Sequence, residues 1–183
     1  EKADDMQRQQ HSAHSTDRRV AIVSDSAADI PEAELDRLDI HMIPVRVHFG
    51  ARSYLDKVGI TSDEFYAEIE RGTEPPKTSQ PPPGDFRRQF EFLGSHHSAV
   101  ISINLSSRVS GTCAAAQTAA ARSATHGKVS VIDTGNVSAG QGLIAMYAAE
   151  CAAAGYDAAR IIAATKAILP RTRSFGVAGS LEY

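Results

Sequence analysis

Short apolar runs alternate along this chain with longer segments in which apolar residues recur every three or four positions. Four of the runs are too short for helices and are bounded by polar or glycine-containing turns, so they predict buried strands. They cover residues 20–24, 41–49, 99–105 and 129–133. The segments between them predict helices at residues 32–38, 61–69, 85–93, 112–123, 138–154 and 157–169. Strands that alternate with helices predict an α/β fold, a three-layer sandwich with a mostly parallel sheet.

Prolines and glycines interrupt this pattern at two places. Pro44 lies inside the second apolar run and places that strand at a sheet edge or at a bulge, because proline lacks the N–H that a central strand donates. The residues that follow, 50–59, predict an extended arm or hairpin. Residues 75–84 contain five prolines, which restrict the backbone and predict a rigid loop.

The two ends of the chain differ from its centre. Residues 1–19 are polar and aperiodic, which predicts a disordered tail or linker. Residues 20–170 carry the alternating pattern of the predicted α/β domain. After Pro170, which ends the last predicted helix, residues 174–177 predict the start of one more strand.

Composition and charge exclude several classes of protein. The 183 residues are 42% hydrophobic and 22% charged, with a net charge of −3, which is ordinary for a soluble globular protein. A general nucleic-acid-binding protein would carry a basic patch, whereas the lysines and arginines here are scattered. No stretch approaches the roughly 18 apolar residues of a membrane span, and the N-terminus lacks the apolar core of a secretory signal. We therefore expect a cytoplasmic protein without stable membrane insertion and without a nucleic-acid partner.

No metal site or redox site is predicted. Cys113 and Cys151 both lie in alanine-rich helical segments, and neither has a partner at metal-ligand spacing. They are expected to be small buried residues in a reducing compartment. His11 and His14 of the N-terminal tail carry only a weak metal-binding signal.

The most informative stretch is Ser106–Thr112, which follows the third predicted strand and precedes an alanine-rich helix. Its hydroxyls and Gly111 leave free backbone N–H groups at the start of that helix. The first turn of a helix attracts anions, because its amides are unpaired and the helix dipole is positive there. The loop contains no strong nucleophile and no metal ligand. It therefore predicts a protein that holds an anionic group.

A second hydroxyl-bearing segment, Thr78-Ser79-Gln80-Pro81, lies in the proline-rich region. Polar residues in such a turn often cap the following helix. Together with the start of the helix at Ser110-Gly111-Thr112, however, they favour a site in which two hydroxyl loops converge on one carboxylate or phosphate. In a parallel sheet, ligands bind beyond the carboxyl ends of the strands, where Asp25, residues 106–112 and Asp133 all fall.

Alternative functions remain open at this point. Asp25-Ser26 or Ser110 could serve a hydrolase or a phosphoryl-transfer enzyme, although no G-x-S-x-G elbow or P-loop accompanies them. The Ser106–Thr112 loop could also cradle the phosphate of a nucleotide. Capping of the following helix is the interpretation we favour for Asp25 or Ser26, and Asp133 is expected to cap or to bond a neighbouring loop. Gly140-Gln141-Gly142 is expected to let a helix pack closely on the sheet.

Six segments in order resemble the DegV family of bacterial fatty-acid-binding proteins. The matching pieces are Val20-Ala21-Ile22-Val23-Ser24-Asp25-Ser26, Ile43-Pro44-Val45 to Phe49-Gly50, Thr78-Ser79-Gln80-Pro81, Ser106-Ser107-Arg108-Val109-Ser110-Gly111-Thr112, Val131-Ile132-Asp133-Thr134 and Ser138-Ala139-Gly140-Gln141-Gly142-Leu143. They extend over most of the chain. Two of them, Thr78-Ser79-Gln80-Pro81 and Ser106–Thr112, carry most of the weight.

The resemblance implies a non-enzymatic carrier, the binding subunit of a fatty acid kinase. A long-chain fatty acid such as palmitate or oleate would lie in a tunnel between two domains. Its carboxylate would meet the hydroxyls of Thr78 and Ser110, with Ser79, Gly111 and Thr112 beside it. A separate ATP-dependent kinase would phosphorylate that carboxylate for phospholipid synthesis. No cofactor, metal or catalytic residue is implied in this chain itself.

Family members run further, through a second domain that covers the acyl chain. Residues 171–183 match only the start of that domain, so we expect a truncated second domain here. A short form of this kind could also assemble with a partner through apolar residues near Phe175 and Val177.

Overall fold

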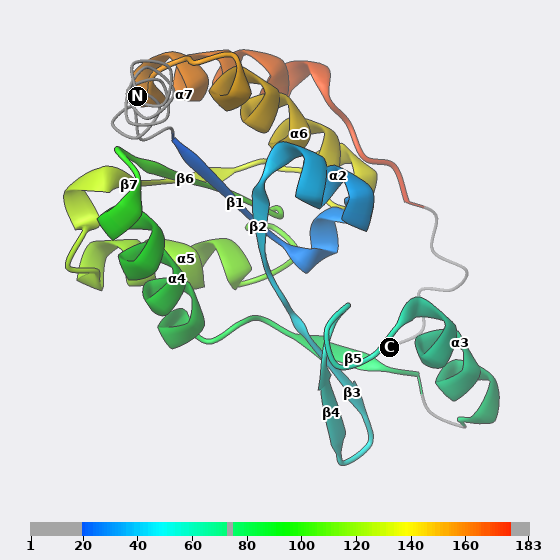
Figure 1. Ribbon diagram of the computed structural model, residues 1–183. Helices are drawn as coiled ribbons and strands as arrows, with labels where there is room; N and C mark the ends of the chain where they lie inside the picture. Colours follow the sequence, from blue (N-terminus) through cyan, green and yellow to red (C-terminus); the bar gives the residue numbers. More distant parts are fainter. Residues whose placement is uncertain (1–19, 73–74, 177–183) are drawn as a thin grey trace, which may run out of the picture.

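The computed structural model describes residues 20–72 and 75–176, and they form two β-sheets with helices around them (Figure 1). Sheet A has four parallel strands in the order β2-β1-β6-β7, and sheet B has three antiparallel strands in the order β4-β3-β5. The strands of sheet A are β2 (Ile40–Ile43), β1 (Ala21–Asp25), β6 (Val100–Asn104) and β7 (Val129–Asp133). The strands of sheet B are β4 (Arg52–Leu55), β3 (Arg46–Phe49) and β5 (Lys77–Ser79).

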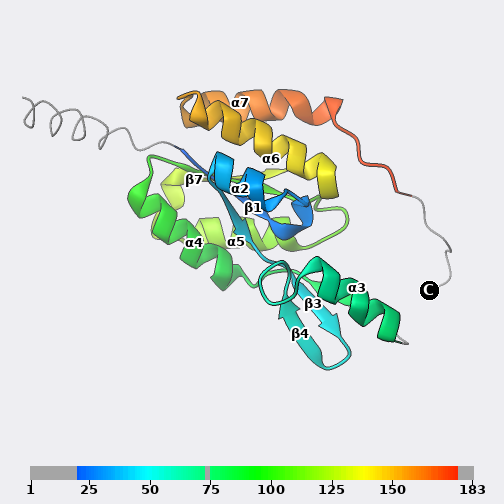
Figure 2. The same ribbon diagram turned by 45° about the vertical axis from the view of Figure 1, so that its right-hand side comes forward.

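Helices cover both faces of sheet A, as Figure 2 shows. One face carries α2 (Glu32–Leu38), α6 (Ser138–Ala153) and α7 (Ala158–Ile168), and the other carries α4 (Pro83–His96) and α5 (Thr112–Arg122). This arrangement confirms the three-layer α/β sandwich with a parallel sheet. A further helix, α3 (Ser62–Arg71), lies beside sheet B.

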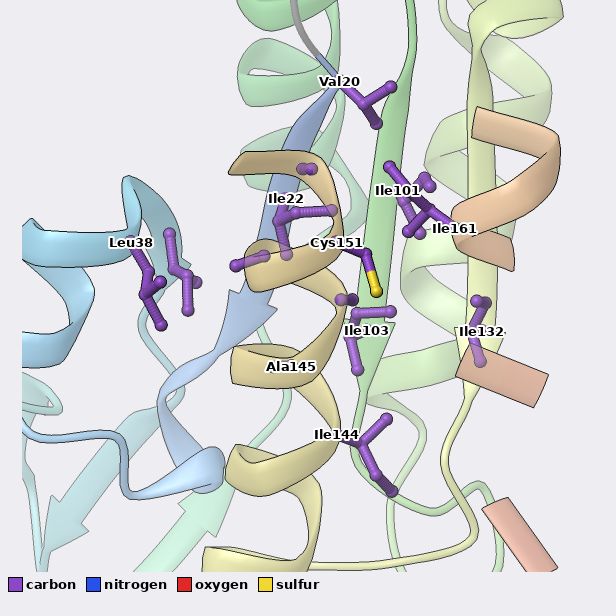
Figure 3. Packing of buried hydrophobic residues seen from close by; sticks show 14 of the residues in the cluster. Val20, Ile22, Leu38, Ile101, Ile103, Ile132, Ile144, Ala145, Cys151 and Ile161 are labelled. Atoms are coloured by element: carbon purple, nitrogen blue, oxygen red, sulfur yellow. The ribbon is translucent and has the colours of Figure 1, made fainter. Parts of the chain in front are cut away.

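Alternating side chains of the buried strands supply two separate cores. In β1, Ile22 packs under α6, whereas Ala21 and Val23 pack on the opposite face with Phe86 and Phe90 of α4. Figure 3 shows the first of these cores, with Ile22 and the β6 isoleucines beneath α6. A strand buried on both faces needs apolar residues at successive positions, which is why the short continuous runs predicted these strands.

Gly142 lets α6 pack closely against the turn η1 (Ser26–Ala28) that follows β1, whereas the sequence predicted close packing of the glycine pair on the sheet itself. A Cβ atom at Gly142 would overlap the carbonyl oxygen of Ala28. Gln141 between the glycines is buried and donates from Nε2 to Ser24 Oγ at 3.2 Å. Cys113 and Cys151 are free and buried, and burial raises the pKa of the Cys113 thiol to about 11. Both cysteines therefore act as small packing residues.

Three predictions about strands need correction. The expected strand at residues 41–49 is two strands, β2 and β3, which belong to different sheets. Pro44 lies between them and has no N–H to donate to a neighbouring strand. The expected rigid loop at 75–84 contains the strand β5. The described residues after η3 (Leu169–Arg171), up to Gly176, contain no strand, and Val177 lies outside the described part of the chain.

Other predictions are confirmed. Residues 50–59 contain β4, which forms a hairpin with β3, and β2 lies at the edge of sheet A. Thr61 begins α3 with a capping box, in which the Thr61 side chain accepts from Glu64 N and the Glu64 side chain accepts from Thr61 N. The predicted tail at residues 1–19, including its two histidines, lies outside the described residues, as do residues 177–183.

Candidate functional site

Strand β5 carries Thr78 and Ser79 on opposite faces of sheet B. It pairs antiparallel with β3, so that Thr78 lies opposite Val47 and Lys77 opposite His48. The Ser79 hydroxyl is 2.8 Å from Nε2 of His48. Thr78 instead lines a surface hollow, because successive side chains of a strand alternate between faces. The assignment of Ser79 to a ligand site stays a prediction, and its hydroxyl contacts His48.

The hollow beside Thr78 has a volume of about 280 Å³. Its walls come from sheet B, from α3 and from the loop after β1, and the lining residues include Val45, Val47, Phe65, Tyr66 and Ser26. Val45 and Val47 precede and follow Arg46 on β3, so they lie on one face of the sheet. Thr78 therefore borders a hollow that combines these apolar side chains with polar and charged residues, namely Ser26, Asp29, Asp56, Lys57, Thr61 and Ser62.

A larger hollow of about 650 Å³ adjoins the first one. The two share the lining residues Asp29, Lys57, Thr61 and Ser62. At this boundary Lys57 Nζ and Asp29 Oδ1 form an ion pair at 3.1 Å. Both residues have the left-handed backbone conformation that glycine favours. The apolar side chains of the larger hollow come from α2, β2 and the loop between β1 and α2, and they are Ile30, Pro31, Leu35, Ile40 and Met42.

Ser110 organises the start of α5. Its hydroxyl accepts from Thr112 N at 3.2 Å and lies 2.9 Å from Thr112 Oγ1. Thr112 is fully buried, whereas Ser110 is half-buried and reaches the surface. Among the described residues, the amides of Cys113 and Ala114 have no hydrogen-bond acceptor, as expected for the first turn of a helix. These amides are the donors at the positive end of the α5 dipole.

The two hydroxyl motifs meet through Gln80 and Gly111. A Cβ atom on residue 111 would overlap Oε1 of Gln80 and would lie 2.9 Å from its Cδ. Gln80 follows Thr78 by two residues, and Gly111 follows Ser110 directly. The fold thus brings together two segments that lie about thirty residues apart in the sequence. The sequence pattern pointed to the segment that contains the Gln80 amide but did not place Gln80 in the site, because its contact with Gly111 depends on the tertiary structure.

Asp25 and Ser26 support the fold at the carboxyl edge of sheet A. Neither caps a helix with its side chain, so the capping interpretation is wrong. The Asp25 carboxylate accepts from Leu105 N at 3.0 Å and from Asn104 Nδ2 at 3.2 Å. Burial raises the pKa of Asp25, and these hydrogen bonds oppose that shift. The buried Ser26 hydroxyl accepts from Val45 N at 3.0 Å and thereby ties β3 to the loop after β1.

Asp133 bonds the neighbouring loop, as the sequence predicted. Its Oδ1 accepts from Ser107 N at 3.2 Å and from Gly135 N at 2.9 Å. Burial acts to raise the pKa of Asp133, but these hydrogen bonds and the charge of Arg108 outweigh it and the net shift is downward. The loops after β1, β6 and β7 therefore lie together at one edge of sheet A, as the strand order predicted.

In residues 20–72 and 75–176, no three residues among the histidines, cysteines, aspartates and glutamates are grouped so that they could hold a metal ion. Across the same residues, none of the helices combines the length and apolarity that crossing a bilayer requires.

Solved structures with the same fold include proteins described as fatty acid binding. A structure described as fatty acid binding of a DegV family protein from Thermus thermophilus has a TM-score of 0.76 and 30% identity, and covers 83% of this chain and 54% of its own. The structure of DegV from Bacillus subtilis, described as a fatty acid binding protein, has a TM-score of 0.77 and 34% identity. It covers 84% of this chain and 54% of its own.

Comparison with sequences gives the same family. A DegV domain-containing protein of Caldanaerobacter subterraneus is 33% identical over 165 residues, 90% of this chain and 58% of the relative. One from Staphylococcus aureus is 36% identical over 161 residues, 88% of this chain and 57% of the relative. The chain thus spans little more than half the length of these curated relatives. A family model described as "Uncharacterised protein, DegV family" matches residues 19–183, and this chain belongs to the DegV family.

Proposed function

We propose that this protein binds a long-chain fatty acid, with the carboxylate held between Thr78 and the start of α5. The observation that carries the proposal is the contact of Gln80 with Gly111, which joins the two hydroxyl motifs. The Ser110 hydroxyl, the backbone at Gly111 and the unpaired amides that follow Thr112 supply the donors. Solved relatives described as fatty-acid-binding proteins support the ligand class.

Neutral donors suit this task because the acyl chain supplies the affinity. At roughly 0.8 kcal/mol per buried CH₂, a chain of about 16 carbons gains on the order of 10 kcal/mol before ordering costs. The head group then needs hydrogen bonds and orientation, since a buried carboxylate without donors is unfavourable. The apolar side chains of the larger hollow, among them Ile30, Leu35 and Met42, offer surface on which part of the acyl chain is buried.

The same site presents the carboxylate to a second protein. A hydroxyl and amides leave more electron density on a carboxylate oxygen than an arginine clamp would, so the oxygen remains nucleophilic. We therefore extend the proposal to an ATP-dependent fatty acid kinase as partner, which phosphorylates the bound carboxylate toward phospholipid synthesis. The proposal gives this chain no catalytic role, and it is supported by the structural hydrogen bonds of the buried Ser26 hydroxyl and of Asp25 Oδ2.

Native mass spectrometry of the purified protein, followed by denaturing extraction, tests the lipid carrier directly. The expected result is a co-purifying C16 or C18 acid, or one bound after incubation with palmitate or oleate. Ser110→Ala and Thr78→Val should each weaken palmitate binding by about tenfold, which corresponds to loss of one hydrogen bond to a charged group. Ser98→Ala and Thr118→Val, at exposed positions, are the matched controls.

Three results would contradict the proposal. Wild-type protein that stays ligand-free with both acids would rule out binding by this chain. Hydrolysis of a reporter ester that is lost in Ser110→Ala would identify a serine hydrolase. A rise in melting temperature with ATP, without any response to oleate, would identify a nucleotide-binding module.

A further inference from the structure

Gly111 leaves room for the end of a neighbouring side chain. Its φ of −75° and ψ of 1° are accessible to any L-residue, so backbone conformation does not require glycine there. A Cβ at this position would displace the end of the Gln80 side chain, which is exposed and flexible, because its Oε1, Cδ and Nε2 all lie within 3.3 Å of that point. Because Gly111 has no side chain, the amide group of Gln80 packs directly against its backbone.

The backbone on both sides of Gln80 is restrained. Thr78 and Ser79 are paired with β3 in sheet B. Pro81 is buried, and Pro82 and Pro83 lead directly into α4. Because the ring of Pro81 disfavours the helical conformation at the residue before it, the backbone of Gln80 is restricted to extended conformations. The side chain that reaches Gly111 thus extends from a backbone that is held by strand pairing on one side and by prolines on the other.

Side-chain contacts tie sheet B to the layers around sheet A, among them the ion pair between Arg46 of β3 and Asp85 of α4 at 3.9 Å. The Ser26–Val45 hydrogen bond and the Lys57–Asp29 ion pair join it to the loop after β1. The Gln80–Gly111 contact joins it to α5, the helix that begins beside Ser110. Of these ties, the last one lies between the two hydroxyl motifs themselves.

We propose that Gln80 is a positioning residue. Its side chain packs against Gly111 and thereby sets the separation between the hydroxyls of Thr78 and Ser110. The inference rests on the proposed function, because that separation matters for a carboxylate bound by both. Gln80 acts through the geometry of its neighbours, and its contribution is pre-organisation of the donors. The ligand class is the carboxylate of the proposed function.

A double-mutant cycle on palmitate affinity tests the inference. Gln80→Ala should weaken binding by about tenfold, and Gly111→Ala should do the same because its methyl group displaces Gln80. The double variant should bind no more weakly than either single variant, because both changes break one contact. Gln117→Ala and Gly127→Ala are the matched controls, since Gln117 is exposed on α5 and a Cβ at Gly127 meets nothing within 4 Å.

A conservative variant separates positioning from direct ligand contact. Gln80→Met keeps the length of the side chain and its packing on Gly111, so it should bind palmitate within about threefold of wild type. Affinity as weak as that of Gln80→Ala would overturn the positioning role. Fully additive losses in the cycle would overturn it as well.

A measurement on the ligand-free protein keeps this inference distinct from the proposed function. Gln80→Ala should shift the amide resonances of Gly111 and Thr112 and accelerate hydrogen exchange in β5, whereas Gln117→Ala should not. Unchanged resonances and exchange would overturn the inference. Wild-type protein that fails to bind palmitate would instead overturn the proposed function, and the amide measurement would still decide whether Gln80 couples the two motifs.

Discussion

Sheet A and sheet B differ in how they are held in place. Every residue of β1 and β6 is buried, and helices cover both faces of their sheet. In sheet B, all three residues of β5 are exposed, and α3 contacts the sheet through rings such as Phe49 and Phe65, whose centroids are 5.6 Å apart. The stability of the protein therefore resides in sheet A. The hydroxyl of Thr78 is carried by the sheet that is less firmly packed.

This difference means that stability and ligand geometry depend on different residues. Loss of packing in the core of sheet A should unfold the whole domain. Loss of a tie between the sheets should leave the domain folded and move Thr78 relative to Ser110.

The largest expected effect is on the core beside β1. Phe86 is fully buried and packs against Phe90, with ring centroids 5.8 Å apart. Phe86→Ala should lower the free energy of unfolding by about 3–5 kcal/mol, because it removes apolar contacts and leaves a cavity. Tyr66→Ala in α3, where the ring is 64% exposed, should change it by less than about 1 kcal/mol. Urea unfolding measures both, and similar losses would contradict the comparison.

An intermediate effect is expected at the tie between the sheets. Ser26→Ala removes the acceptor for Val45 N and leaves a partly buried N–H unpaired, which should lower the free energy of unfolding by about 1 kcal/mol. Hydrogen exchange should accelerate in β3 and β5 and stay slow in β1 and β6. Ser53→Ala on the exposed strand β4 is the control. Uniform acceleration in both sheets would show that sheet B is not an independently mobile unit.

The smallest effect is a pH dependence at the edge strand β2. Burial lowers the pKa of His41, and nearby His97 lowers it further, while Asp39 opposes the shift. The unfolded chain therefore binds a proton more readily than the folded one, and stability falls as the pH drops below about 6.5. His41→Phe should flatten the dependence of unfolding free energy on pH between 7 and 5. Unchanged slopes, equal to those of the exposed-site control His126→Phe, would contradict this assignment.

Sequence patterns predicted the elements whose neighbours lie close in the chain or whose burial is complete. The apolar runs at β1, β6 and β7 and the helix start at Thr61 are of this kind. Strand β5 escaped prediction because three exposed residues carry no apolar pattern, and its pairing depends on β3 about thirty residues earlier. The split at Pro44 was visible as an interruption, but the two sheets to which the halves belong were not.

Like the fold, the candidate site was predicted from the sequence in part. Thr78, Ser110, Gly111 and Thr112 were named from hydroxyl loops, the start of a helix and the family resemblance, and their role remains a proposal. That Ser79 faces His48 follows from the register of β5, which no local pattern specifies. Gln80 entered the site only through its contact with Gly111.

By itself the sequence determined the α/β class, the strands of sheet A and the family, because burial on both faces imposes apolar runs and the motifs are specific. Tertiary structure alone decided which loops meet. Contacts between residues far apart in the chain, such as Gln80 with Gly111 and Ser26 with Val45, depend on how the sheets and helices pack. Packing is a collective property of many side chains, and no short segment encodes it.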